Sequence, residues 1–317
     1  MPQLYPQQLQ ERYESAQSHI PDLTTRVSIK KNRDSLLGEG SYGQVYLGWY
    51  QKNGQDIQVS VLPQFVVALL MEVQVAVKCL MHTPNTKKKI EERLMREMVT
   101  WMSVAQHENV ADLQGICKSV NDPPYLVMPY YHRNKFLLHA SNHPDQRLSL
   151  AKDVARGLDH LHGNHVIHGD IKPENIMISD EGRGQIADFG VSVIPQVKGF
   201  TTVVNWNARQ TAPELLPLDD STPPKPTKES DIFSLGILLL QLFDGRVDCL
   251  PYNRYPLNSA KDPHGIKLIQ AIHAGDRSRR GDYGFNHQGD RWRLIEACWA
   301  ADPHARLTIG QVRQRLA

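Results

Sequence analysis

The sequence predicts an α+β fold of two unequal lobes: a small antiparallel β lobe with one long helix, and a larger, mainly α-helical lobe. Strand patterns around glycines fill residues 32–50. A long amphipathic pattern follows at 86–106, and from residue 146 onward the apolar spacing is mainly helical. A chain of 317 residues with 40% hydrophobic content is long enough for two lobes with a sizeable core.

Residues 32–50 alternate β-branched or aromatic residues around glycines, as two strands joined by a flexible turn would. The segment matches GxGxxGxV at Gly38, Gly40, Gly43 and Val45. Glycines there let backbone amides approach phosphate oxygens, although a plain Gly-rich hairpin would show the same pattern. A strand containing Ala76 and Lys78 comes next, whereas a dinucleotide-binding fold would open into a helix.

The helix expected at 86–106 carries Ile90, Leu94, Met98 and Trp101 at helical spacing. Lys78 needs a carboxylate to fix its position, and three glutamates of this helix are candidates: Glu91, Glu92 and Glu97. A solvated helix face is the ordinary role of such glutamates.

The larger lobe is predicted from helical patterns at 146–165, 229–245 and 291–316. We place an N-terminal extension at 1–31, the small lobe at 32–128, the joining segment at 129–134 and the large lobe at 135–317.

Residues 166–190 hold four polar groups at fixed spacing: Asp170, Lys172, Asn175 and Asp188. Phosphoryl transfer needs a base near the attacking hydroxyl, a cation near the moving phosphoryl group and oxygen ligands for Mg²⁺. These side chains supply that set, so the segment predicts phosphoryl-transfer chemistry.

From about residue 34 to its end, the chain resembles the eukaryotic protein kinase family. Further motifs in the family's order are Ala212-Pro213-Glu214, the run from Ser230 to Gly236, and Arg306. The phrases HGDIKPENIMI, IADFG and ARQTAPELL are similar to those of tyrosine-kinase-like Ser/Thr kinases of fungal type.

The resemblance implies a bilobal protein kinase fold that uses ATP and Mg²⁺. Asp170 would orient the substrate hydroxyl and accept its proton, and Lys172 would contact the γ-phosphoryl group. Asn175 and Asp188 would ligate Mg²⁺. It also favours Glu97 as the partner of Lys78, because Glu97 stands ten residues before the HxN motif at 107–109. The residues expected to hold the nucleotide are Gly38, Gly40, Gly43, Val45, Ala76, Lys78, Glu97, Met128, Tyr130 and Met177.

The loop after Asp170 reads Ile-Lys-Pro-Glu, the Ser/Thr form of this family, so protein substrates with Ser or Thr acceptors are expected. The alternatives are a pseudokinase or scaffold that binds partners through the same fold, a dual-specificity or tyrosine kinase, and a kinase of small molecules.

Two departures from the pattern of the protein kinase family concern regulation and substrate docking. Gly169 replaces the arginine that usually precedes the catalytic aspartate and that needs a phosphorylated loop to neutralise it. Activity is therefore expected not to depend strictly on phosphorylation of Thr201 or Thr202. Asn207 replaces a threonine that normally bonds the catalytic aspartate and lysine.

A third departure is an apolar insert at 59–74, since joining residue 58 to residue 75 gives a more usual hairpin. The codons for its first residues can read like a splice donor, and the codon for its last residue can read like a splice acceptor. A retained intron and a genuine hairpin insertion are therefore both open. An insert of this composition is an aggregation liability rather than a site.

Composition argues against several other functions. A net charge of +2 is too balanced to predict nucleic-acid or anionic-membrane binding. The Gln-rich start has no secretory core, and polar residues interrupt the apolar stretch at 59–77 below the length of a membrane span. Four scattered cysteines indicate neither a disulfide framework nor a thiolate zinc site. We expect a cytoplasmic protein whose partners are protein substrates, without nucleic acid or membrane; the oligomeric state stays open.

Overall fold

The structure is a computed structural model that describes residues 4–40, 43–52, 71–80, 87–119, 122–132, 135–195, 207–216, 218, 224–255, 265–285 and 288–317. The chain divides into two compact units. Unit 1 comprises Met1–Ala105 and Ala111–Tyr131, and unit 2 comprises Gln106–Val110 and His132–Ala317. Unit 1 contains the main sheet and unit 2 is mainly helical, as the predicted α+β fold requires.

Unit 1 is built on an antiparallel sheet with the order β1-β3-β4-β6-β5, and β2 pairs with β3. Its strands are β1 (Val27–Ile29), β2 (Leu36–Gly40), β3 (Gly43–Lys52), β4 (Met71–Leu80), β5 (Gly115–Cys117) and β6 (Tyr125–Pro129). One face of the sheet is apolar, where Val75, Val77 and Val127 pack in a buried cluster with Leu23 and Tyr50. β-Branched residues on alternate positions explain this face.

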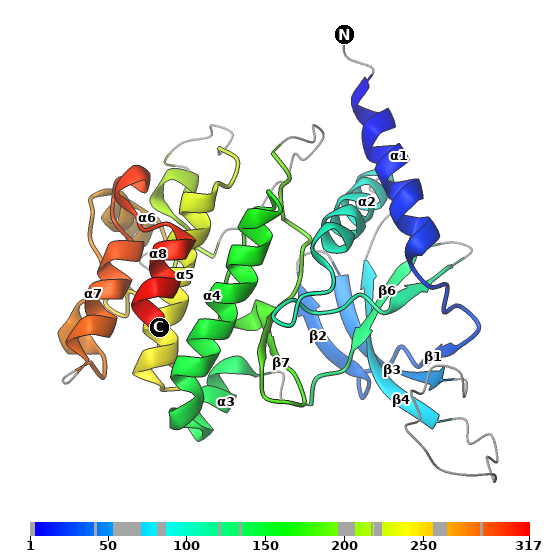
Figure 1. Cartoon of the computed structure of the whole chain (residues 1–317), viewed down its shortest axis with the longest axis horizontal. Helices are drawn as coiled ribbons and strands as arrows, with labels where there is room; N and C mark the ends of the chain where they lie inside the picture. The colour runs from blue at the N-terminus through cyan, green and yellow to red at the C-terminus, as the bar shows by residue number, and fades with distance from the viewer. Residues whose placement is uncertain are drawn as a thin grey trace. The chain divides into compact units, whose positions relative to one another are not determined.

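Two helices complete unit 1, α1 (Leu4–His19) and α2 (Lys87–Val104) (Figure 1). The helix predicted at 86–106 is confirmed as α2, and its apolar positions Leu94, Met98 and Trp101 are buried. The residues before 32, predicted as an extension, include α1 and β1 and cluster with unit 1.

Unit 2 contains the helices α3 (Phe136–Asn142), α4 (Arg147–Gly163), α5 (Lys228–Asp244), α6 (Ile266–His273), α7 (Gly289–Cys298) and α8 (Ile309–Leu316). A hairpin joins β7 (Ile176–Ile178) to β8 (Gly184–Ile186), and the short 3₁₀ turns are η2 (Pro144–Gln146), η3 (Pro173–Asn175), η4 (Pro213–Leu215), η5 (Arg280–Asp282) and η6 (Pro303–Ala305). α5 is buried along most of its length, which its nearly continuous apolar sequence predicts. A capping box at Thr227 and Ser230 begins it, and Gly245 with φ 79° ends it.

The division between the units differs from the predicted lobe boundaries at residues 106–110. Val110 bridges to Ile186, and the Asn109 amide nitrogen donates to the Gly184 carbonyl at 3.0 Å. These bonds to the β7–β8 hairpin explain why the short segment belongs to unit 2.

The apolar insert predicted at 59–74 lies partly outside the described residues, which exclude 53–70. Its last residues, Met71 to Gln74, begin β4 and pair with Lys52 to Trp49 of β3. The choice between a retained intron and a hairpin insertion stays a prediction. Within the described part of the chain, no helix is long and apolar enough to cross a membrane.

Candidate active site

One face of the unit 1 sheet carries four of the side chains expected to hold the nucleotide. Val45 stands opposite Lys78 in the β3–β4 ladder, and Met128 stands opposite Ala76 in the β4–β6 ladder. Ala76 and Lys78 are two residues apart on β4, so they point to the same face. The register therefore brings these four predicted site residues to one face, while the alternate residues of β4 pack in the apolar cluster.

Lys78 forms an ion pair with Glu97 of α2, and its Nζ lies 2.6 Å from Oε1. The side chains are 13% and 0% exposed, respectively. A short, charge-assisted hydrogen bond shielded from water fixes the position of the ammonium group. The rival glutamates have other surroundings: Glu92 is exposed, and Glu91 lies near Tyr13 of α1 and raises its pKa.

The three glycines of the GxGxxGxV segment differ in what surrounds them. A Cβ at Gly38 would meet nothing within 4 Å, whereas one at Gly43 would lie 2.6 Å from the Cys79 carbonyl oxygen. Packing of β3 against β4 therefore explains Gly43, independently of phosphate binding. Gly40 ends β2 opposite Gly43, and residues 41–42 lie outside the described residues.

In unit 2, the loop at 168–175, called the catalytic loop below, brings Asp170, Lys172 and Asn175 together. The Lys172 ammonium donates to Asp170 Oδ2 at 2.6 Å. The Asn175 amide nitrogen donates to the Asp170 backbone carbonyl at 2.8 Å and to Oδ2 at 3.0 Å. The Asp170 and Lys172 side chains are 24% and 25% exposed. The loop therefore presents a carboxylate that is held by two donors and still reachable from solvent.

Asp231, near the start of α5, holds this loop through its backbone. Its Oδ2 accepts the His168 N–H and its Oδ1 accepts the Gly169 N–H, both at 2.8 Å. The His162 Nε2 lies 2.9 Å from the same Oδ2, and Asp231 is 1% exposed. Neither Asp231 nor His162 was among the predicted site residues. The available signal was a carboxylate directly before the long apolar run of α5, because buried carboxylates need partners.

Asp188 follows β8 and lies close to Asn175 along the hairpin. The Ala187 N–H donates to the Asn175 carbonyl at 2.9 Å, and Asp188 Oδ1 accepts the Gly190 N–H at 3.2 Å. Asp188 has φ 65°, a left-handed conformation that is uncommon for a non-glycine residue and often found at functional sites.

The donor chemistry of Asn175 and Asp188 fits Mg²⁺. Because the Asn175 amide nitrogen is directed at Asp170, the amide oxygen is the atom that would ligate a cation. One amide oxygen and one carboxylate suit a hard ion that keeps several waters. Among the described residues, no group of three or more His, Cys, Asp or Glu is placed to hold a metal ion.

The buried histidine and phenylalanine next to these groups contact each other. His168 and Phe189 meet edge to face with ring centroids 5.5 Å apart, and each is at most 1% exposed. The His168 Nε2 also lies 3.1 Å from the Ala187 carbonyl. These contacts give His168 a packed role beside Asp170.

The last two predicted nucleotide contacts are half-buried. Met177 stands between Ile176 and Ile178 on β7, where the flanking residues are buried, and Tyr130 follows β6. The alternation on β7 turns Met177 away from the core of unit 2.

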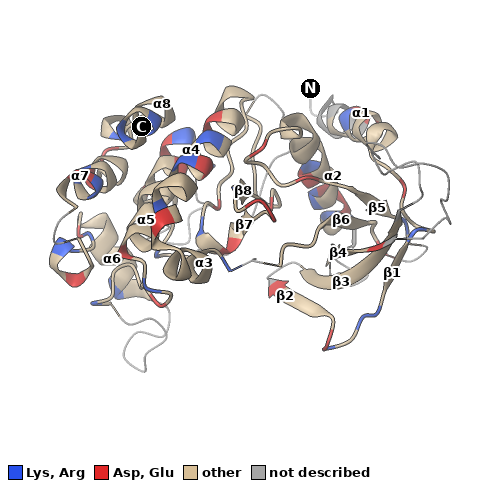
Figure 2. Ribbon diagram, turned by 60° about the horizontal axis from the view of Figure 1, so that its bottom comes forward, with Lys and Arg blue, Asp and Glu red and all other residues tan. Residues whose placement is uncertain are grey.

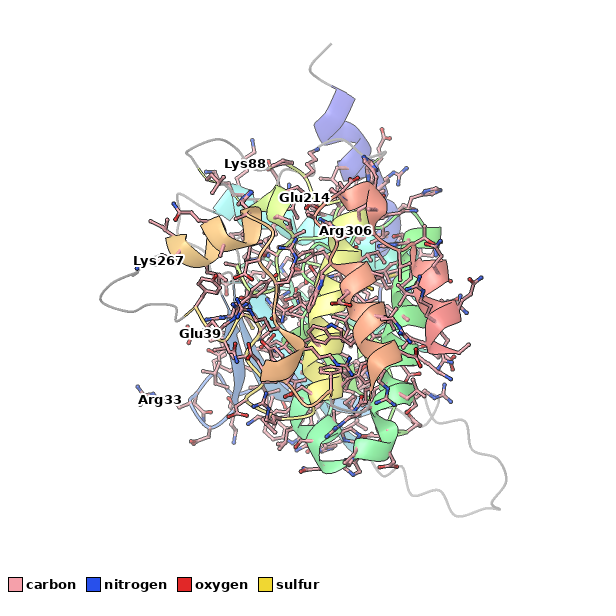
Figure 3. The ribbon with its side chains drawn as sticks, turned by 90° about the vertical axis from the view of Figure 1, so that its left-hand side faces the viewer. Arg33, Glu39, Lys88, Glu214, Lys267 and Arg306 are labelled. Carbon is pink, nitrogen blue, oxygen red and sulfur yellow. The ribbon has the colours of Figure 1, made fainter. Side chains whose placement is uncertain are left out.

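The Ala212-Pro213-Glu214 motif is fixed by an ion pair. Arg306 donates to both carboxylate oxygens of Glu214, at 2.7 and 2.8 Å, and its side chain is 0% exposed (Figure 3).

Asn207, which replaces the family's threonine, closes a local turn. Its Oδ1 accepts the Arg209 N–H at 3.3 Å, and its carbonyl accepts the N–H groups of Gln210 and Thr211. Thr201 and Thr202 lie outside the described residues.

Comparisons with known proteins agree with this geometry. The family model described as protein kinase domain matches residues 66–316. An L-type lectin-domain containing receptor kinase, S.1, of Arabidopsis thaliana is 31% identical over 225 residues, which cover 68% of this chain and 30% of the relative. The serine/threonine/tyrosine-protein kinase HT1 of the same plant is 25% identical over 283 residues, which cover 85% of this chain and 61% of the relative.

A bacterial protein kinase is also similar to this chain. The serine/threonine-protein kinase PrkC of Bacillus subtilis (strain 168) is 27% identical over 226 residues, covering 70% of this chain and 31% of the relative. The chain thus spans less than two thirds of the length of each of these relatives.

Proposed function

Because this chain belongs to the protein kinase family, we propose that it transfers the γ-phosphoryl group of Mg·ATP to Ser or Thr hydroxyls of protein substrates. The observation that carries the proposal is the cluster of Asp170, Lys172 and Asn175. A carboxylate held by two donors is positioned to accept a hydroxyl proton, and its lysine lies close enough to meet the transferred group.

Unit 1 supplies the residues that would hold the nucleotide. The ammonium of Lys78, fixed by Glu97, would bind the α- and β-phosphates, and the face shared by Val45, Ala76 and Met128 would pack on the adenine. Asn175 and Asp188 would hold Mg²⁺, which offsets negative charge on the phosphates when it is bound.

The acceptor class rests on the loop that begins at Asp170. Lys172 stands two residues after the base, as in the Ser/Thr members of the family, and PrkC is named for that acceptor class. HT1 is named for tyrosine as well, so dual specificity is the alternative to be tested. We also propose that the chain belongs to the tyrosine-kinase-like group of fungal type, on the phrases around Asp170, Asp188 and Glu214.

The test uses three acceptor peptides that differ only in one residue, Ser, Thr or Tyr, with γ-labelled ATP and Mg²⁺. We expect label on the Ser and Thr peptides, and at least about tenfold less on the Tyr peptide. Equal labelling of the Tyr peptide would replace the proposal with dual specificity.

Nucleotide binding is measured on the same preparation. Tight binding of Mg·ADP without transfer to any peptide or to a generic basic protein would favour a scaffold over an enzyme.

A further inference from the structure

The N-terminal helix α1 packs against α2, and Figures 1 and 2 both show the two helices side by side. Leu9 and Ile20 are each 6% exposed, and Tyr13 and Ala16 are half-buried. Leu9, Tyr13 and Ala16 recur at helical spacing along α1, and Ile20, directly after its end, continues the same stripe. Burial and then the nearby Glu91 carboxylate of α2 raise the pKa of Tyr13, so this part of the stripe lies close to α2.

The chain that leaves α1 is fixed to the edge of the sheet. The Ile116 N–H donates to the Pro21 carbonyl at 2.9 Å, and the Leu23 N–H donates to the Ile116 carbonyl at 2.8 Å. A Cβ at Gly115 would lie 2.6 Å from the Pro21 carbonyl oxygen, so the close approach requires glycine. One end of α1 is therefore anchored at β5 while its body lies against α2.

The position of α2 decides where Glu97 stands. Glu97 is fully buried, and its neighbours Met98 and Trp101 are also 0% exposed. The Trp101 indole N–H donates to the Ala111 carbonyl at 2.6 Å. Because close-packed side chains leave little freedom, Glu97 meets Lys78 at 2.6 Å only while α2 keeps this place.

We propose that α1 is a positioning element for Glu97, whose docking on α2 sets the fraction of molecules with a correctly held Lys78. The inference rests on the proposed function, since Lys78 is taken to bind the nucleotide phosphates. α1 has 16 mostly polar residues, a length at which an isolated helix is marginal in water. Its docking is then an equilibrium between docked and undocked molecules. The apparent nucleotide affinity is proportional to the fraction of molecules in which α1 is docked, so undocking lowers it.

The test compares variants of the full chain by calorimetric titration with Mg·ADP. Leu9→Asp puts a carboxylate into the buried stripe and is expected to weaken binding roughly tenfold. Ser15→Asp adds the same charge at an exposed position of α1, and Leu9→Met keeps the apolar contact. Both controls are expected to bind within about twofold of wild type. Ala16→Asp, at a half-buried position of the stripe, serves if Leu9→Asp does not fold.

A double-mutant cycle separates positioning from general stability. If α1 acts through Glu97, Leu9→Asp changes the affinity of a Glu97→Gln protein by less than about twofold. Unchanged binding by Leu9→Asp alone, or an equal loss in both backgrounds, would overturn the proposal. Phosphoryl transfer by the wild type is measured in parallel. If the wild type transfers phosphate and Leu9→Asp leaves Mg·ADP binding unchanged, only the positioning role is refuted. If the wild type binds Mg·ADP but transfers nothing, the proposed function is refuted.

Discussion

Gly169 has a backbone conformation that few other residues adopt. Its φ is 78°, and a Cβ there would lie 3.2 Å from Pro226 Cγ and 3.3 Å from the Val191 carbonyl oxygen. The left-handed region costs an L-residue roughly 1–2 kcal/mol. In this chain glycine therefore removes backbone strain next to Asp170, in addition to removing the charge of the usual arginine.

Replacing Gly169 with alanine is expected to lower the free energy of unfolding by about 1–2 kcal/mol, since the added methyl group is both strained and crowded. Urea unfolding measures the loss. The matched control is Gly163→Ala at the end of α4, where a Cβ meets nothing within 4 Å and φ is not left-handed. Equal stability of the two variants would show that Gly169 carries no conformational requirement.

At the scale of elements, Gln210 and the catalytic loop are tied to α5. Asp231 accepts two backbone N–H groups of the catalytic loop, and Ser234 Oγ donates to the Gln210 carbonyl at 2.8 Å. These bonds tie His168, Gly169 and Gln210 to α5.

We therefore expect the Thr201→Ala, Thr202→Ala double variant to keep its turnover within about threefold of wild type, because no arginine at position 169 needs a phosphate partner. Steady-state transfer to a Ser peptide measures this. Abolished turnover with intact Mg·ADP binding would show that loop phosphorylation is required.

The β3–β4 ladder predicts the effect of deleting residues 59–74. The pairs from Gly43↔Leu80 to Gly48↔Val75 lie outside the deletion, whereas those from Trp49↔Gln74 to Lys52↔Met71 are lost. The remaining ladder holds Lys78 opposite Val45, so Mg·ADP affinity is expected to stay within about threefold of wild type. The soluble fraction should rise, because an apolar, weakly charged segment is removed.

A large loss of Mg·ADP affinity in the deletion variant would make the segment a required part of unit 1. Transcript reads that cover the codons for 59–74 uniformly in every sample would separately exclude a retained intron.

For the whole molecule, periodicity and motif order predicted the helices and strands whose buried apolar residues recur at regular spacing. α2, α4 and α5 follow from apolar spacing, and β2 and β3 from alternation around glycines. α1 was missed because its stripe of Leu9, Tyr13, Ala16 and Ile20 lies in a Gln-rich, polar segment whose burial depends on α2.

The site was predicted where the chemistry is local in sequence. Asp170, Lys172 and Asn175 lie within one loop, and the structure brings their side chains into contact. The role of Asp231 depends on backbone groups more than sixty residues away, which no local pattern contains. Glu97 was predicted over its rivals from its spacing to the HxN motif at 107–109, and the ion pair with Lys78 agrees.

The central claim is that Asp170 is the base of a working phosphoryl-transfer site. The most direct measurement is the initial rate of γ-phosphoryl transfer by Asp170→Asn and by wild type, with Mg·ADP affinity determined on both. The amide keeps the shape of the carboxylate but accepts no proton, so the rate should fall about 10²–10⁴-fold while the affinity changes by less than about twofold. Equal transfer rates, or a wild type that transfers nothing, would contradict it.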